Sequence, residues 1–324
     1  MIRLRGFVDL QVNGFRGVDF SAPDLTEAAA ATALRGLVAD GTALLLPTLI
    51  TAPEAVYARN LPLLARLAAN PEFARHVPGF HLEGPFLCPR EGAAGAHNPA
   101  WMRTGDPAFL DRLQEWAGGR IRLITIAPDI AGAPALIAHA RRLGIAVALG
   151  HHLGNAGEMA SAAQAGATCL THLGNGLPHL IDRHRNPLID GLADDRLAAC
   201  LIGDGHHLPW NLVKVILRVK GLDACALVSD ASALAGLPPG TYPCFGAIAV
   251  INAEGRLFNP ATGYLMGSSF TIRRVVNATR RALGLDTAVL RRLAVLNPLR
   301  LIGMTPPPGL AELPRDADGD WLPV

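Results

Sequence analysis

The sequence predicts a (β/α)8 barrel, in which eight parallel strands alternate with helices. Three observations support this fold class. Short apolar segments alternate with longer amphipathic segments along almost the whole chain. Half of the 324 residues are hydrophobic and 17% are charged, as expected for a sheet buried on both faces. The length suits one barrel domain. A doubly wound open sheet is the alternative.

The predicted strands are all short enough for a barrel. They comprise residues 5–12, 42–47, 78–83, 121–127, 145–150, 168–173, 197–203 and 224–229. The predicted helices comprise residues 24–39, 53–69, 107–117, 132–143, 156–165, 188–195, 208–220 and 268–284. Asp24, with Glu27 three residues on, predicts a capping box at the first helix, and Pro53 marks the start of the second. We expect the barrel to occupy residues 1–304 and a C-terminal tail to occupy 305–324.

Composition excludes several classes of partner. The 29 basic and 27 acidic residues are spread along the chain without a basic run, which argues against nucleic-acid binding. Apolar stretches such as LLLPTLI are far below the ~20 residues that span a bilayer. The five cysteines are widely spaced and suggest no disulfide framework. We therefore expect a cytoplasmic protein that acts on a small molecule, without a nucleic-acid or membrane partner.

Polar side chains end most of the predicted strands. They are Asp9, Gln11, Asn13, Thr48, His81, Glu83, Asp129, His151, His172, Asp204, His206, His207 and Asp230. In a closed parallel barrel the carboxyl ends of all strands meet at one rim, where catalytic groups gather. Buried ionisable groups are costly unless they are paired or bind a metal. The sequence therefore predicts an active site at this rim.

Glu83, His151 and His172 form the predicted metal site. Two imidazoles and one carboxylate are a common set of catalytic zinc ligands, and they leave positions open for water and substrate. Asp230 ends the eighth strand, where it can take a proton from water and pass it to a leaving amine. For each of these residues alone, a core histidine or a turn aspartate would be the ordinary interpretation.

Other residue types limit the number of metal ions. The only lysines, Lys214 and Lys220, fall in the predicted seventh helix, so no lysine at a strand end can bridge two metals. Gln11 and Asn13 stand at the end of the first strand, and amides are poor zinc ligands. We therefore expect one divalent ion, zinc in the first place, with Fe²⁺ or another divalent ion as alternatives.

An ordered set of motifs extends these observations over residues 6–302. The motifs are DLQVNGFRGVDF at 9–20, HLEGPFL at 81–87, GAH at 95–97, GH at 150–151, AGATCLTHLGN at 165–175, IGDGHH at 202–207, LVSDASALAGLPPGTY at 227–242, LMGSS at 265–269 and NPLRLIGM at 297–304. In these motifs the chain resembles the N-acetylglucosamine-6-phosphate deacetylase family of metal-dependent amidohydrolases.

The resemblance implies a barrel of the amidohydrolase kind that removes acetate from an N-acetyl amino sugar 6-phosphate. It implies the same metal ligands, with Asp230 as the acid/base and His97 at the substrate carbonyl. It also implies a homodimer, since the family supplies the arginine matching Arg185 from the neighbouring subunit. The implied substrate-binding residues are Ala96, His97, Asn175, Gly176, Arg185, His207, Leu265, Met266 and Gly267.

The chain departs from the family pattern around the sugar pocket and at its ends. His152 to Gly154 intervene after His151, Gly174 replaces a bulky residue, and the segment from Arg185 to Leu188 is altered. The family's accessory β-sandwich is expected to be absent or vestigial, because the first barrel strand begins almost at Met1. Two other functions stay open: hydrolysis of a different N-acyl or cyclic amide, and a catalytically silent barrel that binds sugar phosphates.

Overall fold

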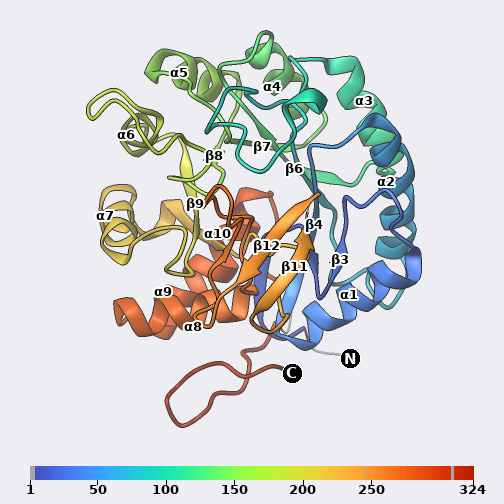
Figure 1. The fold of residues 1–324 in the computed structure, drawn as a ribbon, viewed down its shortest axis with the longest axis vertical. Coiled ribbons are helices and arrows are strands. Elements are labelled where there is room, and N and C mark those ends of the chain that lie inside the picture. The colour runs from blue at the N-terminus through green and yellow to red at the C-terminus, as the bar shows by residue number, and fades with distance from the viewer. Residues whose placement is uncertain (1–3, 245, 308–309) are drawn as a thin grey trace.

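The computed structural model describes residues 4–244, 246–307 and 310–324, and an eight-stranded parallel sheet forms its centre (Figure 1). All eight predicted strand regions are confirmed. The strands are β1 (Phe7–Val12), β4 (Thr42–Ile50), β5 (Phe80–Glu83), β6 (Ile121–Ile126), β7 (Ala146–Leu149), β8 (Cys169–Leu170), β9 (Ala198–Ile202) and β10 (Cys225–Val228), and each pairs with the next in this order. The sheet curves into a nearly closed barrel whose carboxyl strand ends share one rim.

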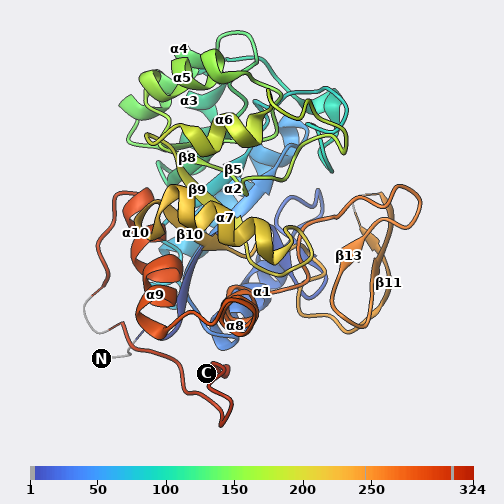
Figure 2. The ribbon, with the colours of Figure 1, turned by 90° about the vertical axis from the view of Figure 1, so that its left-hand side faces the viewer.

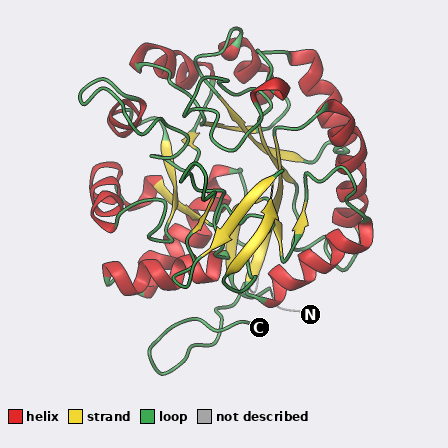
Figure 3. Ribbon diagram, viewed as in Figure 1, coloured by secondary structure: helices red, strands yellow, loops and turns green. Residues whose placement is uncertain are grey.

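Helices surround the sheet on its outer face (Figures 1 and 3). They include α1 (Glu27–Ala39), α2 (Glu54–Ala69), α3 (Pro107–Trp116), α4 (Ala133–Arg142), α5 (Ala156–Ala165), α6 (Pro187–Ala193), α7 (Trp210–Lys220) and α8 (Ile272–Leu283), as the amphipathic segments predict. The predicted cap of α1 is wrong. Thr26, not Asp24, accepts the hydrogen bond from Ala29 N, because the helix begins at Glu27.

A seam remains between the first and the last strand of the barrel. In the described part of the chain, β1 and β10 are joined by the isolated bridge Val12–Ala231 rather than by a continuous ladder. Asn13 N donates to Ala231 O at 2.7 Å. The Asp9 carboxylate accepts from Ser229 N at 3.0 Å and from Ser229 Oγ at 2.5 Å. Side-chain hydrogen bonds thus complete the closure at the carboxyl ends of these strands.

A small antiparallel sheet, which the sequence analysis did not predict, follows β10. It consists of β11 (Gly240–Cys244), β12 (Ala247–Ile251) and β13 (Leu257–Phe258), and Figure 2 shows it projecting from the side of the barrel. One face is held by an apolar cluster that includes Ile251 and Met266. The bridge Phe258–Leu265 then directs the chain to the barrel rim.

The remaining elements complete the helical layer and the loops. They are β2 (Gly14–Phe15), β3 (Val18–Asp19), the 3-10 turns η1 (Pro99–Trp101) and η2 (Leu222–Ala224), α9 (Thr287–Arg291), the π-helical η3 (Arg292–Leu296) and α10 (Asn297–Leu301). Near the C-terminus, Trp321 is buried and packs edge-on against Phe7 at 5.3 Å between ring centroids. In the described residues, no helix combines the length and apolar character that crossing a membrane requires.

Candidate active site

A cavity of about 370 Å³ opens at the carboxyl ends of the barrel strands. The structure brings together in its lining every predicted site residue except Arg185. These are Glu83, Ala96, His97, His151, His172, Asn175, Gly176, His207, Asp230, Leu265, Met266 and Gly267. Glu83, His151, His172 and Asp230 lie at or just after the ends of barrel strands, as the closed sheet predicts, whereas the other residues come from the loops above the same rim.

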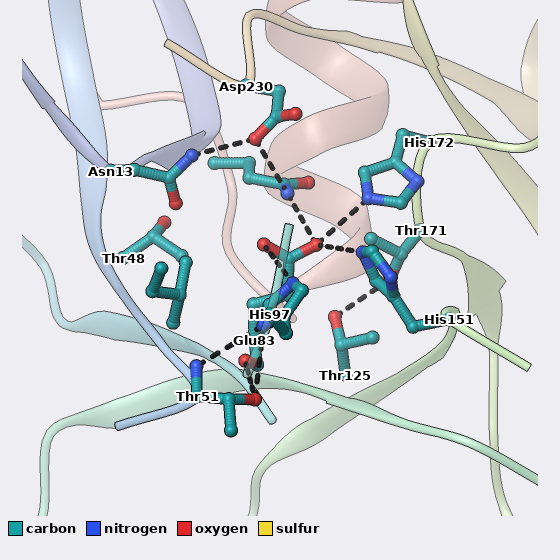
Figure 4. Close-up of polar contacts among 12 residues, drawn as sticks. Asn13, Thr48, Thr51, Glu83, His97, Thr125, His151, Thr171, His172 and Asp230 are labelled. Atoms are coloured by element: carbon teal, nitrogen blue, oxygen red, sulfur yellow. Dashed lines mark hydrogen bonds and ion pairs between the residues drawn. The ribbon is translucent and has the colours of Figure 1, made fainter. Parts of the chain in front are cut away.

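The Glu83 carboxylate is the centre of the cavity floor (Figure 4). Its Oε1 lies 2.9 Å from His172 Nε2 and 3.3 Å from His151 Nε2. Burial opposes ionisation of Glu83, but the hydrogen bonds from His151 and His172 outweigh it and hold the pKa of Glu83 well below its usual range. Burial alone would lower the pKa of His172, but its hydrogen bond to Glu83 and the charge of Glu83 raise it above its usual value. The floor therefore favours a cation beside an ionised Glu83.

The environment of His151 prepares it as a metal ligand. Its Nδ1 lies 2.8 Å from the carbonyl oxygen of Ala93, to which the protonated nitrogen donates. The same bond keeps the other ring proton on Nδ1 when a cation replaces the Nε2 proton beside Glu83, and such a backbone contact is usual behind a metal-binding imidazole. His172 Nδ1 is buried and has no hydrogen-bond partner in the described residues. A buried set of one carboxylate and two imidazole nitrogens fits a zinc-like ion.

His97 is a fourth member of this cluster. Its ligating nitrogen, that of His151 and a Glu83 oxygen all lie within 4.8 Å of one another, so His97 is a geometric alternative to His172 as a ligand. His97 Nδ1 lies 3.1 Å from Thr51 Oγ1 and can accept from Thr51 N at 3.4 Å, and burial lowers the pKa of His97 to about 3. A neutral ring that accepts at Nδ1 carries its proton on Nε2. In the tautomer that accepts from Thr51 N, His97 presents a hydrogen-bond donor to the cavity.

Asp230 lies across the cavity floor from the histidines. Its Oδ1 accepts from Gln11 Nε2 at 3.0 Å and from Asn13 Nδ2 at 2.8 Å, and Gln11 Nε2 also donates to Glu83 Oε1 at 2.9 Å. Burial, together with the charge of Glu83, raises the pKa of Asp230 to about 6. This buried carboxyl group can exchange a proton near neutral pH.

Gln11 and Asn13 thus have a role that the sequence analysis missed. Their amides are poor metal ligands, but their side chains donate to Glu83 and Asp230 and hold these two carboxylates in fixed positions. Their spacing of two residues in a strand, which places both side chains on the same face, was the available signal.

Three floor residues share an unusual backbone conformation. His151, His172 and Asp230 have φ angles of 52°, 28° and 51°, in the left-handed region that side chains other than glycine rarely adopt. Each residue follows a barrel strand directly or closely. The turn ends the extended chain and directs the side chain into the cavity.

His207 forms one wall of the cavity. Its Nδ1 lies 2.8 Å from Asp204 Oδ2, which also accepts from Ser268 Oγ at 2.8 Å. Burial would raise the pKa of Asp204, but the neighbouring His207 lowers it well below its usual range. His206 instead lies 3.1 Å, through Nε2, from the carbonyl oxygen of Glu254 and does not line the cavity.

Arg185 lies away from the cavity of its own chain. Its side chain is exposed, in a loop where Asp182 accepts from the backbone amides of His184 and Arg185. No arginine or lysine of the described residues lines the cavity. The same loop contributes His179, whose ring stacks on Tyr264 with 4.7 Å between centroids. His179 and Tyr264 both line the cavity and were not predicted.

Comparison with known proteins gives consistent results, although no protein-family model matches the chain. The chain is 32% identical over 324 residues to N-acetylglucosamine-6-phosphate deacetylase of Danio rerio, covering 97% of this chain and 78% of that protein. It is 31% identical to N-acetylgalactosamine-6-phosphate deacetylase of Escherichia coli O157:H7, covering 92% and 77%.

A solved structure shares the fold. A mutant N-acetyl-D-glucosamine-6-phosphate deacetylase from Mycobacterium smegmatis, in complex with N-acetyl-D-glucosamine-6-phosphate, superposes with a TM-score of 0.84 at 31% identity. The match covers 93% of this chain and 78% of that one.

Proposed function

Because this chain belongs to the N-acetylglucosamine-6-phosphate deacetylase family, we propose that it hydrolyses the acetamide of an N-acetyl amino sugar 6-phosphate. The products are acetate and the amino sugar phosphate. One observation carries the proposal: a histidine–carboxylate cluster and a proton-accepting Asp230 lie in one cavity, linked by Gln11.

We assign one divalent ion, in the first place zinc, to Glu83, His151 and His172. When bound, such an ion polarises the amide carbonyl and lowers the pKa of a water molecule. We assign His97 to the substrate rather than to the metal, because the tautomer in which Nδ1 accepts from Thr51 N carries a hydrogen on Nε2, the nitrogen that faces Glu83. His97 instead donates a hydrogen bond to the carbonyl oxygen of the substrate, where negative charge develops.

Asp230 moves the proton. Hydrolysis adds the oxygen of water to the carbonyl carbon, breaks the bond from carbon to nitrogen, and requires a proton on the departing nitrogen. Ionised Asp230 accepts a proton from the attacking water and then donates it to that nitrogen. Gln11 and Asn13 keep its Oδ1 in place during this exchange.

The far end of the cavity binds the sugar phosphate. His207, oriented by Asp204, and the backbone at Asn175 and Gly176 line it, but the described residues of a single chain supply no guanidinium there. We propose that Arg185 of a second copy completes the phosphate site in a homodimer. Its exposure supports this arrangement, and Leu180 in the same loop is 92% exposed. The five buried free cysteines are consistent with a reducing, cytoplasmic location.

The direct test is acetate release from a panel of N-acetyl hexosamines, each offered with and without a 6-phosphate. The proposal expects the highest kcat/KM on a phosphorylated N-acetyl hexosamine. Turnover only of other N-acyl or cyclic amides would assign a different substrate to the same fold. Binding of the sugar phosphates without turnover would indicate a silent binding protein.

A further inference from the structure

Asp9 is a buried carboxylate that the proposed chemistry does not use. Its side chain has no exposed surface, and it lies on β1 at the barrel seam. All its hydrogen bonds come from the backbone or from a hydroxyl: Ser229 N at 3.0 Å, Ser229 Oγ at 2.5 Å and Gln11 N at 3.4 Å. It therefore joins the first strand to the residue immediately before Asp230.

Asp230 needs such support for two reasons. Its φ of 51° is unfavourable for a residue with a side chain, and such a conformation persists only where its surroundings fix it. In addition, β10 has no continuous ladder to β1 at this point in the described chain. Among the described residues, backbone pairing on that side is confined to the Val12–Ala231 bridge, where Asn13 N donates to Ala231 O at 2.7 Å.

The contacts of Ser229 surround the Asp230 peptide. Ser229 N and Oγ both donate to Asp9, and Ser229 Oγ accepts from Ala231 N at 3.0 Å. One serine thus connects the residues on both sides of Asp230 to one carboxylate. On the other side, Ser268 N donates to Asp230 O at 2.8 Å.

We infer that Asp9 is a positioning residue, which acts through Ser229 to hold the Asp230 backbone in the conformation that catalysis requires. The inference rests on the proposed acid/base function of Asp230. Asp9 itself touches neither the substrate nor the metal ligands. Its removal should therefore reduce turnover without weakening substrate binding.

The test is a double-mutant cycle with Asp9→Asn and Ser229→Ala, measured as kcat and KM for acetate release by the metal-loaded enzyme. A small misplacement of a catalytic group costs about tenfold to a hundredfold in rate, so each variant should lose kcat by about this factor. KM and the metal content per chain should stay within about twofold of wild type. Since the two residues act in series, the double variant should lose little more kcat than the single variant that is more strongly impaired.

Val228→Ala is the matched control. Val228 is buried next to Ser229, so this variant loosens the same strand without touching the Asp9 contacts. It should lower the melting temperature and leave kcat nearly unchanged. If Asp9→Asn does not fold, Ser229→Ala alone carries the test, because it removes a single oxygen atom.

Hydrogen exchange provides a readout that does not depend on activity. The amides of Ser229 and Ala231 should exchange at least about tenfold faster in both polar variants than in Val228→Ala. Unchanged exchange, unchanged kcat, additive losses or a loss confined to KM would each overturn the inference. A wild-type protein that releases no acetate would instead reject the proposed function, and exchange would still decide whether Asp9 fixes this turn.

Discussion

Replacing Asp230 by asparagine should stabilise the metal-free protein above pH 6 while it abolishes most of the activity. The amide oxygen of asparagine can still accept from Gln11 and Asn13, so the local structure should persist. Asparagine cannot exchange a proton, and general acid–base catalysis contributes about 10²- to 10⁴-fold in rate. We expect kcat to fall by this factor.

The stability change follows from the pKa of Asp230. Burial raises this pKa from 3.8 to about 6, so the folded chain binds the proton more tightly than the unfolded chain does. The resulting stability is fully present below pH 4 and is lost as the pH rises to 6. The loss amounts to about 3 kcal/mol for a group that is 8% exposed. Asparagine avoids this loss. The free energy of unfolding of the variant minus that of wild type should therefore be up to about 3 kcal/mol larger at pH 8 than at pH 4.

Urea unfolding of chelator-treated wild type and Asp230→Asn at the two pH values measures this change. Asp204→Asn is the matched control of opposite sign. The pKa of Asp204 is lowered from 3.8 because His207 outweighs its burial, so its ionised form stabilises the fold above about pH 4 and this control should be destabilised at both pH values. A stability difference for Asp230→Asn that is the same at both pH values would refute the electrostatic reasoning. More than about a tenth of the wild-type rate would refute the acid/base role.

Three further predictions follow from the cavity. His172→Ala should lose most of its bound metal while His97→Ala keeps about one ion per chain, as measured by elemental analysis; two tightly held ions per wild-type chain would contradict the ligand assignment. Arg185→Ala and His207→Ala should each raise KM for a phosphorylated substrate by about tenfold to a hundredfold, because a charge-assisted hydrogen bond is lost, and should change little on the free sugar. Mixing Arg185→Ala chains with chains inactivated at Asp230 should restore activity if the arginine crosses a dimer interface, and equal loss on both sugars would make Arg185 structural. In a pH–rate profile, kcat/KM should fall below pH 6 as Asp230 becomes protonated, and a flat profile down to pH 4.5 would exclude this residue as the base.

The regular part of the fold was accessible from sequence because it repeats. Each barrel strand is a short apolar run, and its neighbours in space are its neighbours in sequence. The strands β11 to β13 also pair in sequence order, but they lack the continuous apolar run of a barrel strand. Their sheet lies between β10 and α8, only one of its faces is packed, and its exposed residues, such as Ile248 at 51%, obscure the apolar pattern of a buried strand.

The site residues also fall into a part that the sequence pattern predicts and a part that it does not. Glu83, His151 and His172 were predictable because parallel strands bring their carboxyl ends to one rim. The bonds of Gln11 and Asn13 to Asp230 cross the seam between β1 and β10, so they depend on how the barrel closes. Arg185 was assigned by resemblance, and its position within one chain follows from loop geometry that strand periodicity does not encode.

The left-handed turns at His151, His172 and Asp230 suggest how loss of function in this fold would be recorded in sequence. Each turn costs about 1–2 kcal/mol with an ordinary side chain and almost nothing with glycine. Selection for stability alone would therefore favour glycine or asparagine at all three positions. Chains of this fold that no longer perform chemistry should accumulate these residues there, whereas active ones must keep the three unfavourable side chains.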